Sequence, residues 1–82
     1  GSVVLTFFVF APGKIAAING EAEAKALPGV IDLRLLVKPG DELAAPKSGA
    51  GRHGFAILQA EDRENLDRVY AQMIDTLGVE YA

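Results

Sequence analysis

The first pattern in the chain is a run of apolar residues with no polar face, from Val3 to Phe10. Its β-branched and aromatic residues predict a strand, in which alternate side chains point to opposite faces. Both faces are apolar: one carries Val3, Leu5, Phe7 and Val9, and the other carries Val4, Thr6, Phe8 and Phe10. This pattern is typical of a strand covered on both sides, and a chain this short can cover one side well. We therefore expect the second face to be covered by another domain, another subunit or an unusually wrapped helix of the same chain. The competing interpretation is a central strand with local cover on both faces.

A turn follows this strand at Ala11-Pro12-Gly13. Proline fixes the φ angle of the first central position of a turn, and glycine accepts the positive φ of the second. The short run Lys14 to Ile18 then returns as a strand. We expect these two strands to pair as a β-hairpin.

A short helix is expected between Gly20 and the Pro28-Gly29 stop. Either Asn19 or Gly20 is suited to cap its N-terminus. Glu21 and Lys25 are spaced four residues apart in the order that favours an ion pair on a helix surface. The segment is therefore amphipathic and brief.

Two more strands flank a long loop. The apolar face of the first strand carries Ile31, Leu33, Leu35 and Val37. Its other face is wetter because it carries Asp32 and Arg34. The loop from Pro39 to His53 exceeds the usual connection of about 4–6 residues, and loops of this length are often functional or mobile. Gly54 to Ala60 then reads as the second of these strands.

The last element is an amphipathic helix. Its apolar residues recur at helical spacing: Leu66, Val69, Tyr70, Met73, Ile74 and Leu77. Asp62 is placed to cap the N-terminus and Gly78 to end the helix. The remaining residues, Val79 to Ala82, are expected to form a short edge strand or a tail.

These elements predict an α+β fold. The expected order is β-hairpin, helix, strand, long loop, strand, helix, in a mainly antiparallel four-stranded sheet with two helices packed mostly on one face. Gly1-Ser2 matches the scar left by tag cleavage, so residues 3–82 are taken as one domain. We expect this domain to be a fragment of a larger protein.

Composition excludes several classes of function. The net charge is −3 and the Lys and Arg residues are scattered, which argues against nucleic acid. No cysteine and a single histidine leave no thiolate or histidine-based metal cluster. The apolar run at the start is shorter than the roughly 20 residues that cross a membrane. A cytoplasmic protein fits this composition.

No catalytic, cofactor-binding or metal-binding residue is expected. Ser48 and His53 share a loop, but a serine hydrolase needs a third residue and an oxyanion hole. The adjacent carboxylates Asp41 and Glu42 are more typical of a soluble loop than of a cation site. The glycines of the loop match neither a P-loop nor a dinucleotide fingerprint.

One candidate site is the loop segment that contains Lys47, Ser48, Arg52 and His53. Lys47 and Arg52 flank a Ser-Gly-Ala-Gly stretch whose backbone amides suit an anion. The competing interpretation is a flexible, solvated loop tip. Both remain open at this point.

Short motifs through most of the chain resemble a known family. They are Ala26-Leu27-Pro28-Gly29-Val30, Lys38-Pro39-Gly40-Asp41, and then Pro46, Ser48, Arg52 and Gly54. Their order resembles the C-terminal subdomain of ATP-grasp ligases of the L-amino acid ligase type. In that family a Pro-Gly-Lys turn and an Arg-x-Gly segment hold the positions filled here by Pro12-Gly13-Lys14 and Arg52-His53-Gly54. The resemblance extends from Val4 to about Leu77.

This resemblance implies a parent enzyme that joins a carboxylate to an amine. ATP would activate the acid as an acyl phosphate, with Mg²⁺ neutralising the phosphates. The ATP-binding and metal-binding residues of such enzymes lie upstream, so the fragment alone is expected to be inactive. Its partner would be the upstream ATP-grasp core of the same polypeptide, with the long loop near the active-site rim.

Two further expectations belong to the isolated chain. One is a stand-alone module of ferredoxin-like build that binds a small molecule or forms a dimer. The other is a homodimer of the fragment through the strand Val3 to Phe10, because large apolar patches rarely stay exposed.

Overall fold

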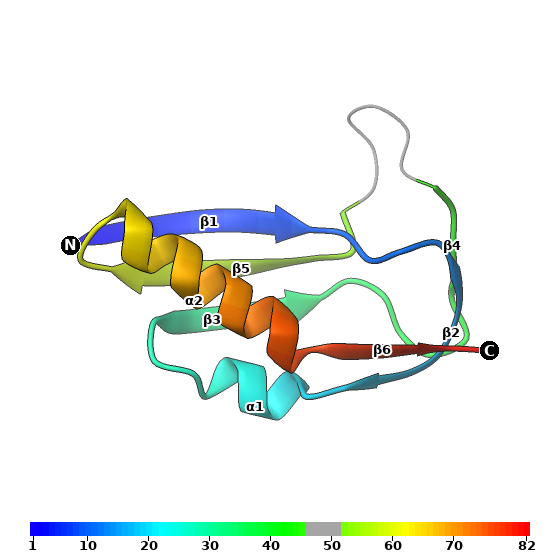
Figure 1. Ribbon diagram of the computed structural model, residues 1–82. Helices are drawn as coiled ribbons and strands as arrows, with labels where there is room; N and C mark the ends of the chain where they lie inside the picture. Colours follow the sequence, from blue (N-terminus) through cyan, green and yellow to red (C-terminus); the bar gives the residue numbers. More distant parts are fainter. Residues whose placement is uncertain (46–51) are drawn as a thin grey trace.

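The computed structural model describes residues 1–45 and 52–82 and contains two helices and six strands (Figure 1). The strands are β1 (Ser2–Phe8), β2 (Gly13–Asn19), β3 (Val30–Leu35), β4 (Glu42–Leu43), β5 (Gly54–Ala60) and β6 (Gly78–Tyr81). The helices are α1 (Glu21–Lys25) and α2 (Arg63–Thr76). The fold is therefore α+β, as the sequence predicts.

The strands form two antiparallel three-stranded sheets, ordered β1-β5-β3 and β4-β2-β6. The expectation of one four-stranded sheet is wrong. This division also departs from the single sheet of a ferredoxin-like build. In Figure 1 the first sheet starts beside the N-terminus, and β2 and β4 close the opposite end of the molecule.

The expected hairpin between the first two strands does not form. β1 pairs with β5 along its whole length, from Ser2 opposite Ala60 to Phe8 opposite Gly54. Beyond β1 the chain crosses to the other sheet, and side chains from distant segments hold its backbone. The N–H of Phe10 donates to Nδ1 of His53 (2.8 Å), and the hydroxyl of Tyr81 donates to the carbonyl of Ala11 (2.7 Å). These bonds direct the segment away from β1.

The second sheet combines the predicted strand β2 with one segment of the expected loop and with the C-terminal residues, which were expected to be an edge strand or a tail. β4 lies within the expected loop and pairs with the start of β2, and β6 pairs with the rest of β2. The C-terminal residues therefore form an edge strand, one of the two outcomes expected for them. The buried side chains of Ile15 and Leu43 pack in this part of the molecule.

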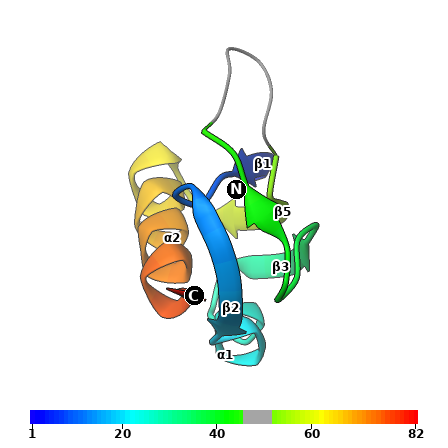
Figure 2. The same ribbon diagram turned by 90° about the vertical axis from the view of Figure 1, so that its right-hand side faces the viewer.

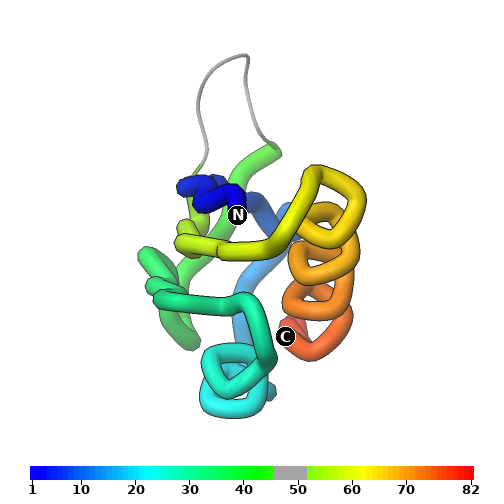
Figure 3. The backbone as a smooth tube through the Cα atoms, turned by 90° about the vertical axis from the view of Figure 1, so that its left-hand side faces the viewer, coloured from blue at the N-terminus to red at the C-terminus, as the bar shows by residue number. Residues whose placement is uncertain are grey.

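The main core lies between the first sheet and the two helices. Figure 2 shows α2 and α1 alongside the sheets, and Figure 3 shows both helices on one side of β1, β5 and β3. Small residues allow the close approach of helix and sheet, because Ala24 of α1 and Ala56 of β5 are fully buried. The buried cluster contains Phe8, Ala24, Leu33, Ala56, Leu58, Leu66, Met73 and Leu77. All six apolar positions predicted for the last helix lie in this cluster or pack against it.

Local signals at the ends of the helices are largely confirmed. The carboxylate of Asp62 accepts the N–H of Asn65 (2.9 Å), as expected of an N-cap. Gly20 caps α1 in the left-handed conformation, without a side-chain bond. The last helix ends at Thr76, and Gly78 begins β6 rather than serving as a left-handed stop.

A bulge corrects the predicted face of β3. The register with β5 shifts between Val30 and Asp32, and one extra residue in a strand reverses the side on which the following residues lie. Val30 and Leu33 consequently both pack toward the core, whereas Ile31 is 55% exposed. The prediction that Ile31 shares the buried face is wrong for this reason.

Within the described residues, no helix is both long enough and apolar enough to span a membrane.

Candidate functional site

The outer face of the first sheet is an exposed apolar surface. Because both helices lie on the other side of this sheet (Figure 3), no helix covers the odd-numbered residues of β1. Val3 is 60% exposed, Leu5 54% and Phe7 40%. We call this surface the open sheet face. Its apolar residues are Val3, Leu5 and Phe7 of β1, Phe55 and Ile57 of β5, Ile31 of β3 and Leu36 directly after β3. Asp32 and Arg34 of β3 lie opposite Ile57 and Phe55 on the same face and form an ion pair at its β3 side.

Aromatic side chains dominate one end of the open sheet face. The rings of Phe7 and Phe55, which lie opposite each other on paired strands, are 6.0 Å apart and tilted by 59°. The guanidinium carbon of Arg52 lies 4.0 Å from the centroid of the Phe7 ring, a cation–π contact. Arg52 therefore places a positive charge at the β1 side of the open sheet face.

The four predicted loop residues do not form one described site. Lys47 and Ser48 lie outside the described residues, so the anion-binding interpretation that includes them stays a prediction. Arg52 stacks on Phe7 of the open sheet face, whereas His53 is buried with 8% exposure.

His53 has a structural position instead of a place at a solvent-facing rim. Its Nδ1 accepts the N–H of Phe10, and its ring stacks on that of Phe10 with centroids 6.1 Å apart. Its backbone N–H donates to the carbonyl of Phe8 (3.0 Å), and its carbonyl accepts the N–H of Leu36 (2.9 Å). The imidazole therefore supplies the acceptor that the chain needs where it leaves β1.

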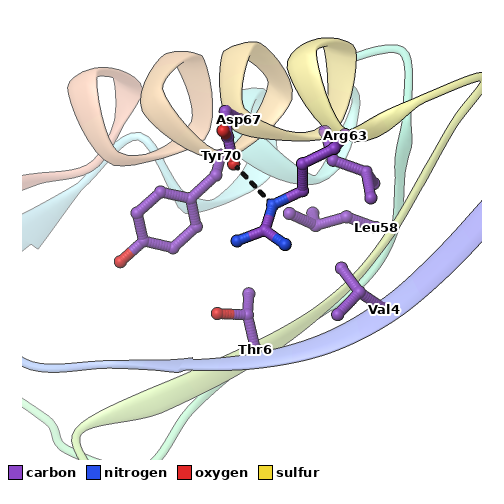
Figure 4. Close-up of a pocket in the computed structure, with 7 residues that line it drawn as sticks. Val4, Thr6, Leu58, Arg63, Asp67 and Tyr70 are labelled. Atoms are coloured by element: carbon purple, nitrogen blue, oxygen red, sulfur yellow. Dashed lines mark hydrogen bonds and ion pairs between the residues drawn. The ribbon is translucent and has the colours of Figure 1, made fainter.

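A groove lies on the helix side of the sheet, between β1 and α2. Its volume is about 280 Å³, and its walls are Val4, Thr6, Leu58, Arg63, Leu66, Asp67 and Tyr70 (Figure 4). α2 packs on β5 and α1 packs on β3. On the helix side of the sheet, β1 is therefore covered less than β5 or β3. Val4 is accordingly 38% exposed even though it lies on the inner face of the sheet.

The charges of the groove sit at its rim. Nε of Arg63 is 3.4 Å from a carboxylate oxygen of Asp67, and both side chains are largely exposed. Exposed pairs of this kind contribute about 0–1 kcal/mol to stability. The groove is therefore apolar at its floor, with a weak ion pair along one wall.

The clearest electrostatic feature is the turn formed by Lys38 and Asp41. One carboxylate oxygen of Asp41 accepts the backbone N–H of Lys38 (2.9 Å), and the other lies 3.0 Å from its ammonium group. These hydrogen bonds with Lys38 lower the pKa of Asp41 below its ordinary value of 3.8. Gly40 takes a φ of +97° in this turn, as the Pro-Gly pattern predicts. Asp41 thus stabilises a turn.

The described residues present an exposed apolar surface and a groove. Within residues 1–45 and 52–82, no group of three or more His, Asp or Glu side chains is arranged to hold a metal ion. Sequence reasoning missed Phe55 and Ile57 as parts of the surface. The signal was available, since these bulky residues alternate with the small, helix-facing Ala56 and Ala60.

Comparison with protein families gives one match that spans nearly the whole chain. The family model described as "L-amino acid ligase C-terminal domain 2" matches residues 6–82. The match includes both helices and the strands β2 to β6.

A solved structure and a curated protein are also similar. The crystal structure of L-amino acid ligase from Bacillus licheniformis matches with a TM-score of 0.76 and 20% identity, over 98% of this chain and 20% of that one. At this identity the likeness shows the fold alone. The uncharacterized protein y4rH of Sinorhizobium fredii (strain NBRC 101917 / NGR234) is 28% identical over 65 residues, covering 79% of this chain and 14% of that protein. The chain thus spans about a fifth or less of these relatives.

Proposed function

This chain belongs to the L-amino acid ligase C-terminal domain 2 family, and we propose that it serves as the C-terminal subdomain of an ATP-dependent ligase. The reaction of the parent would join a carboxylate to an amine, with an amino acid or peptide as substrate. The family match and the likeness to one such ligase over 98% of the chain support this proposal. Since the reaction consumes ATP, the cytoplasm is the expected compartment of the parent enzyme.

The open sheet face carries this proposal. Monomeric proteins rarely leave a contiguous apolar patch of this kind exposed unless it binds something. Here Leu5 and Phe7 project from one strand beside Phe55 and Ile57 of the next. We infer that the ATP-grasp core of the same polypeptide packs on this face, much as one layer of a domain packs on another.

The chain supplies no ATP or Mg²⁺ site of its own in this proposal. Mg²⁺ prefers several oxygen ligands, and the described carboxylates gather in no such group. The open sheet face is apolar apart from Asp32, Arg34 and Arg52, and its two arginines already contact Asp32 and the Phe7 ring, which does not suit a nucleoside triphosphate. The nucleotide and metal would be held by the upstream core, and the fragment alone would be inactive.

The first experiment reads the gene immediately upstream of this segment. An open reading frame that encodes an ATP-grasp region there supports the proposal. A frame with no such region removes it.

A binding experiment then tests the surface. The parent core, expressed without this segment, is titrated with the chain in a calorimeter, and a saturable complex is expected. Ile57→Lys, which puts a charge on the open sheet face, should weaken binding at least tenfold. The matched control is Ala71→Lys, because Ala71 is an exposed residue of α2 and the substitution adds the same charge. Equal binding by both variants would contradict packing through this face.

A second candidate function is a stand-alone module that binds a small molecule. The groove between β1 and α2 favours it, because its volume is near the lower end of ligand pockets. Amino acids and nucleotides at millimolar concentration should then raise the melting temperature of the chain. No change in melting temperature with any of them would count against this function.

A further inference from the structure

The outer edge of β1 is an unpaired strand edge. In the sheet order β1-β5-β3, β1 has a neighbour on one side, and no strand of the described chain lies along its other side (Figure 1). An unpaired edge presents backbone N–H and C=O groups that can bond another strand. In β1 this edge is seven residues long and its pairing with β5 is uninterrupted.

The register identifies which backbone groups face outward. The carbonyl of His53 accepts from Leu36, and the N–H of Gln59 donates to Gly29 (2.8 Å), so these odd-numbered groups point toward β3. Backbone groups alternate sides along a strand, so the even-numbered groups of β5 point toward β1. Their partners on β1 are also even-numbered. The N–H and C=O groups of Val3, Leu5 and Phe7 therefore face the open edge.

The other sheet edges of the described chain carry features that discourage pairing, and β1 carries none. β3 has a bulge and the charged residues Asp32 and Arg34. β4 is two residues long, and β6 contains Glu80. Short strands, bulges and charges are the usual protections of an edge. The residues of β1 include no charge, no proline and no bulge.

We propose that β1 pairs with β1 of a second copy of this chain, antiparallel and about a two-fold axis at Leu5. An antiparallel pair of identical strands is self-complementary, which is the form of a symmetric dimer. With Leu5 opposite Leu5 of the second copy, Val3 of each copy lies opposite Phe7 of the other. All of these residues have outward-facing backbone groups, so the hydrogen bonds match. The β1-β5-β3 sheets of the two copies then form one continuous sheet of six strands.

The charges at the two ends of β1 favour this arrangement. Arg52 lies over Phe7 near the C-terminal end of β1. Glu61 follows Ala60, the residue opposite Ser2 at the N-terminal end. An antiparallel pair brings the basic end of one copy to the acidic end of the other at both ends of the interface. A parallel pair would place like charges together.

Pairing through the edge leaves the open sheet face free. The inference therefore does not rest on the proposed function, and a monomer would leave packing on a ligase core untouched. It does extend the open sheet face, because the apolar residues of the two copies become continuous across the paired strands.

The oligomeric state tests the proposal. Sedimentation of the chain at increasing concentration should give a mass of twice 8.7 kDa. Leu5→Pro removes the N–H at the centre of the proposed pair, which in the monomer points to solvent, so it should yield a folded monomer. Leu5→Ala keeps that N–H and should still dimerise. A native chain that stays monomeric at millimolar concentration would overturn the proposal.

Two more variants separate edge pairing from contact between faces. Leu5→Lys places two ammonium groups opposite each other and should also give a monomer, which serves if Leu5→Pro does not fold. Ile57→Lys charges the open sheet face without altering the edge, so it should still dimerise. If Ile57→Lys is monomeric and Leu5→Pro is dimeric, the copies meet through their faces and the edge proposal is wrong.

Amide hydrogen exchange gives a residue-level readout. Protection at Val3, Leu5 and Phe7 should rise with protein concentration, by at least tenfold between dilute and concentrated samples. Protection at Val4 and Thr6 should be the same at both concentrations, because their amides bond β5. Concentration-independent exchange at the three odd-numbered residues in a dimeric sample would refute strand pairing.

Discussion

The imidazole of His53 accepts the backbone N–H of Phe10 at 2.8 Å, across 43 positions of sequence. The same residue bonds Phe8 and Leu36 through its backbone, so it joins the end of β1, the crossover and the end of β3. The acceptor role requires that Nδ1 carry no proton. One buried side chain thus stabilises the place where the chain passes between its two sheets.

Replacing His53 with alanine should lower the free energy of unfolding by about 1–3 kcal/mol, because the N–H of Phe10 loses its acceptor inside the protein. The measurement is urea denaturation followed by circular dichroism. His53→Asn is the matched control, since its side-chain oxygen can take the place of Nδ1, and it should recover part of the loss. A stability equal to that of the native chain for His53→Ala would show that the bond contributes nothing.

Substitutions at Gly20 and Gly40 distinguish the cost of a strained backbone from the cost of a steric clash. Both have positive φ, +84° at Gly20 and +97° at Gly40, and a left-handed conformation costs a residue with a side chain about 1–2 kcal/mol. A Cβ at Gly40 meets no atom within 4 Å, so Gly40→Ala should cost about that amount. A Cβ at Gly20 would collide with the carbonyl oxygen of Thr76. Gly20→Ala should therefore cost about 3 kcal/mol or more.

Thermal or urea unfolding of the two variants, measured side by side, checks this order. Equal losses would mean that the loop around Gly20 moves to admit the methyl group. A larger loss for Gly40→Ala would contradict the geometry described here.

The turn at Asp41 should make the free energy of unfolding depend on pH in the acid range. Because hydrogen bonds with Lys38 lower the pKa of Asp41, the folded state binds this proton less readily than the unfolded state. The contribution of Asp41 to stability is therefore present above its ordinary value of 3.8 and is lost as pH falls through the lower folded pKa. Carboxyl titration by NMR should place the folded pKa below 3.8.

Lys38→Met removes the side-chain donor and should raise the pKa of Asp41 toward its ordinary value. Asp41→Asn should remove the part of the acid dependence that comes from this turn. An unchanged pKa for Asp41 in Lys38→Met would mean that the backbone N–H alone accounts for the shift.

The N-cap of the last helix gives a further test. Asp62→Ala removes the acceptor of the N–H of Asn65 and should lower the free energy of unfolding by about 1 kcal/mol. Glu64→Ala serves as the control, because its ion pair with Arg68 is exposed and contributes about 0–0.5 kcal/mol. Both are read from chemical denaturation. A loss at Glu64 as large as that at Asp62 would contradict the capping role.

Much of the local structure was predictable because its determinants lie within a few residues. The Pro-Gly turn after Lys38, the Asp62 cap and the apolar spacing of the last helix involve neighbours in sequence, and all three are present. The apolar character of both faces of β1 could also be predicted from the sequence. Its outcome, one face packed on the core and one open, required the positions of the helices.

The candidate loop site shows how tertiary structure separates neighbouring residues. Arg52 and His53 are adjacent in sequence and were taken together, yet one stacks on Phe7 of the open sheet face and the other is buried beside Phe10. Their separation depends on the path of β1 after Phe8. Nothing near Arg52 in the sequence encodes that path.

The sequence by itself determined the two helices, the strands β1, β2, β3 and β5, the apolar side of the last helix, and the family to which this segment is similar. Only the tertiary structure decided that β1 pairs with β5, that the chain crosses into a second sheet, and that Ile31 turns outward at a bulge. The physical reason is the range of the interactions. Caps and turns satisfy their backbone groups locally. The partners of β1 lie on β5, more than 40 residues along the chain, where many pairings compete.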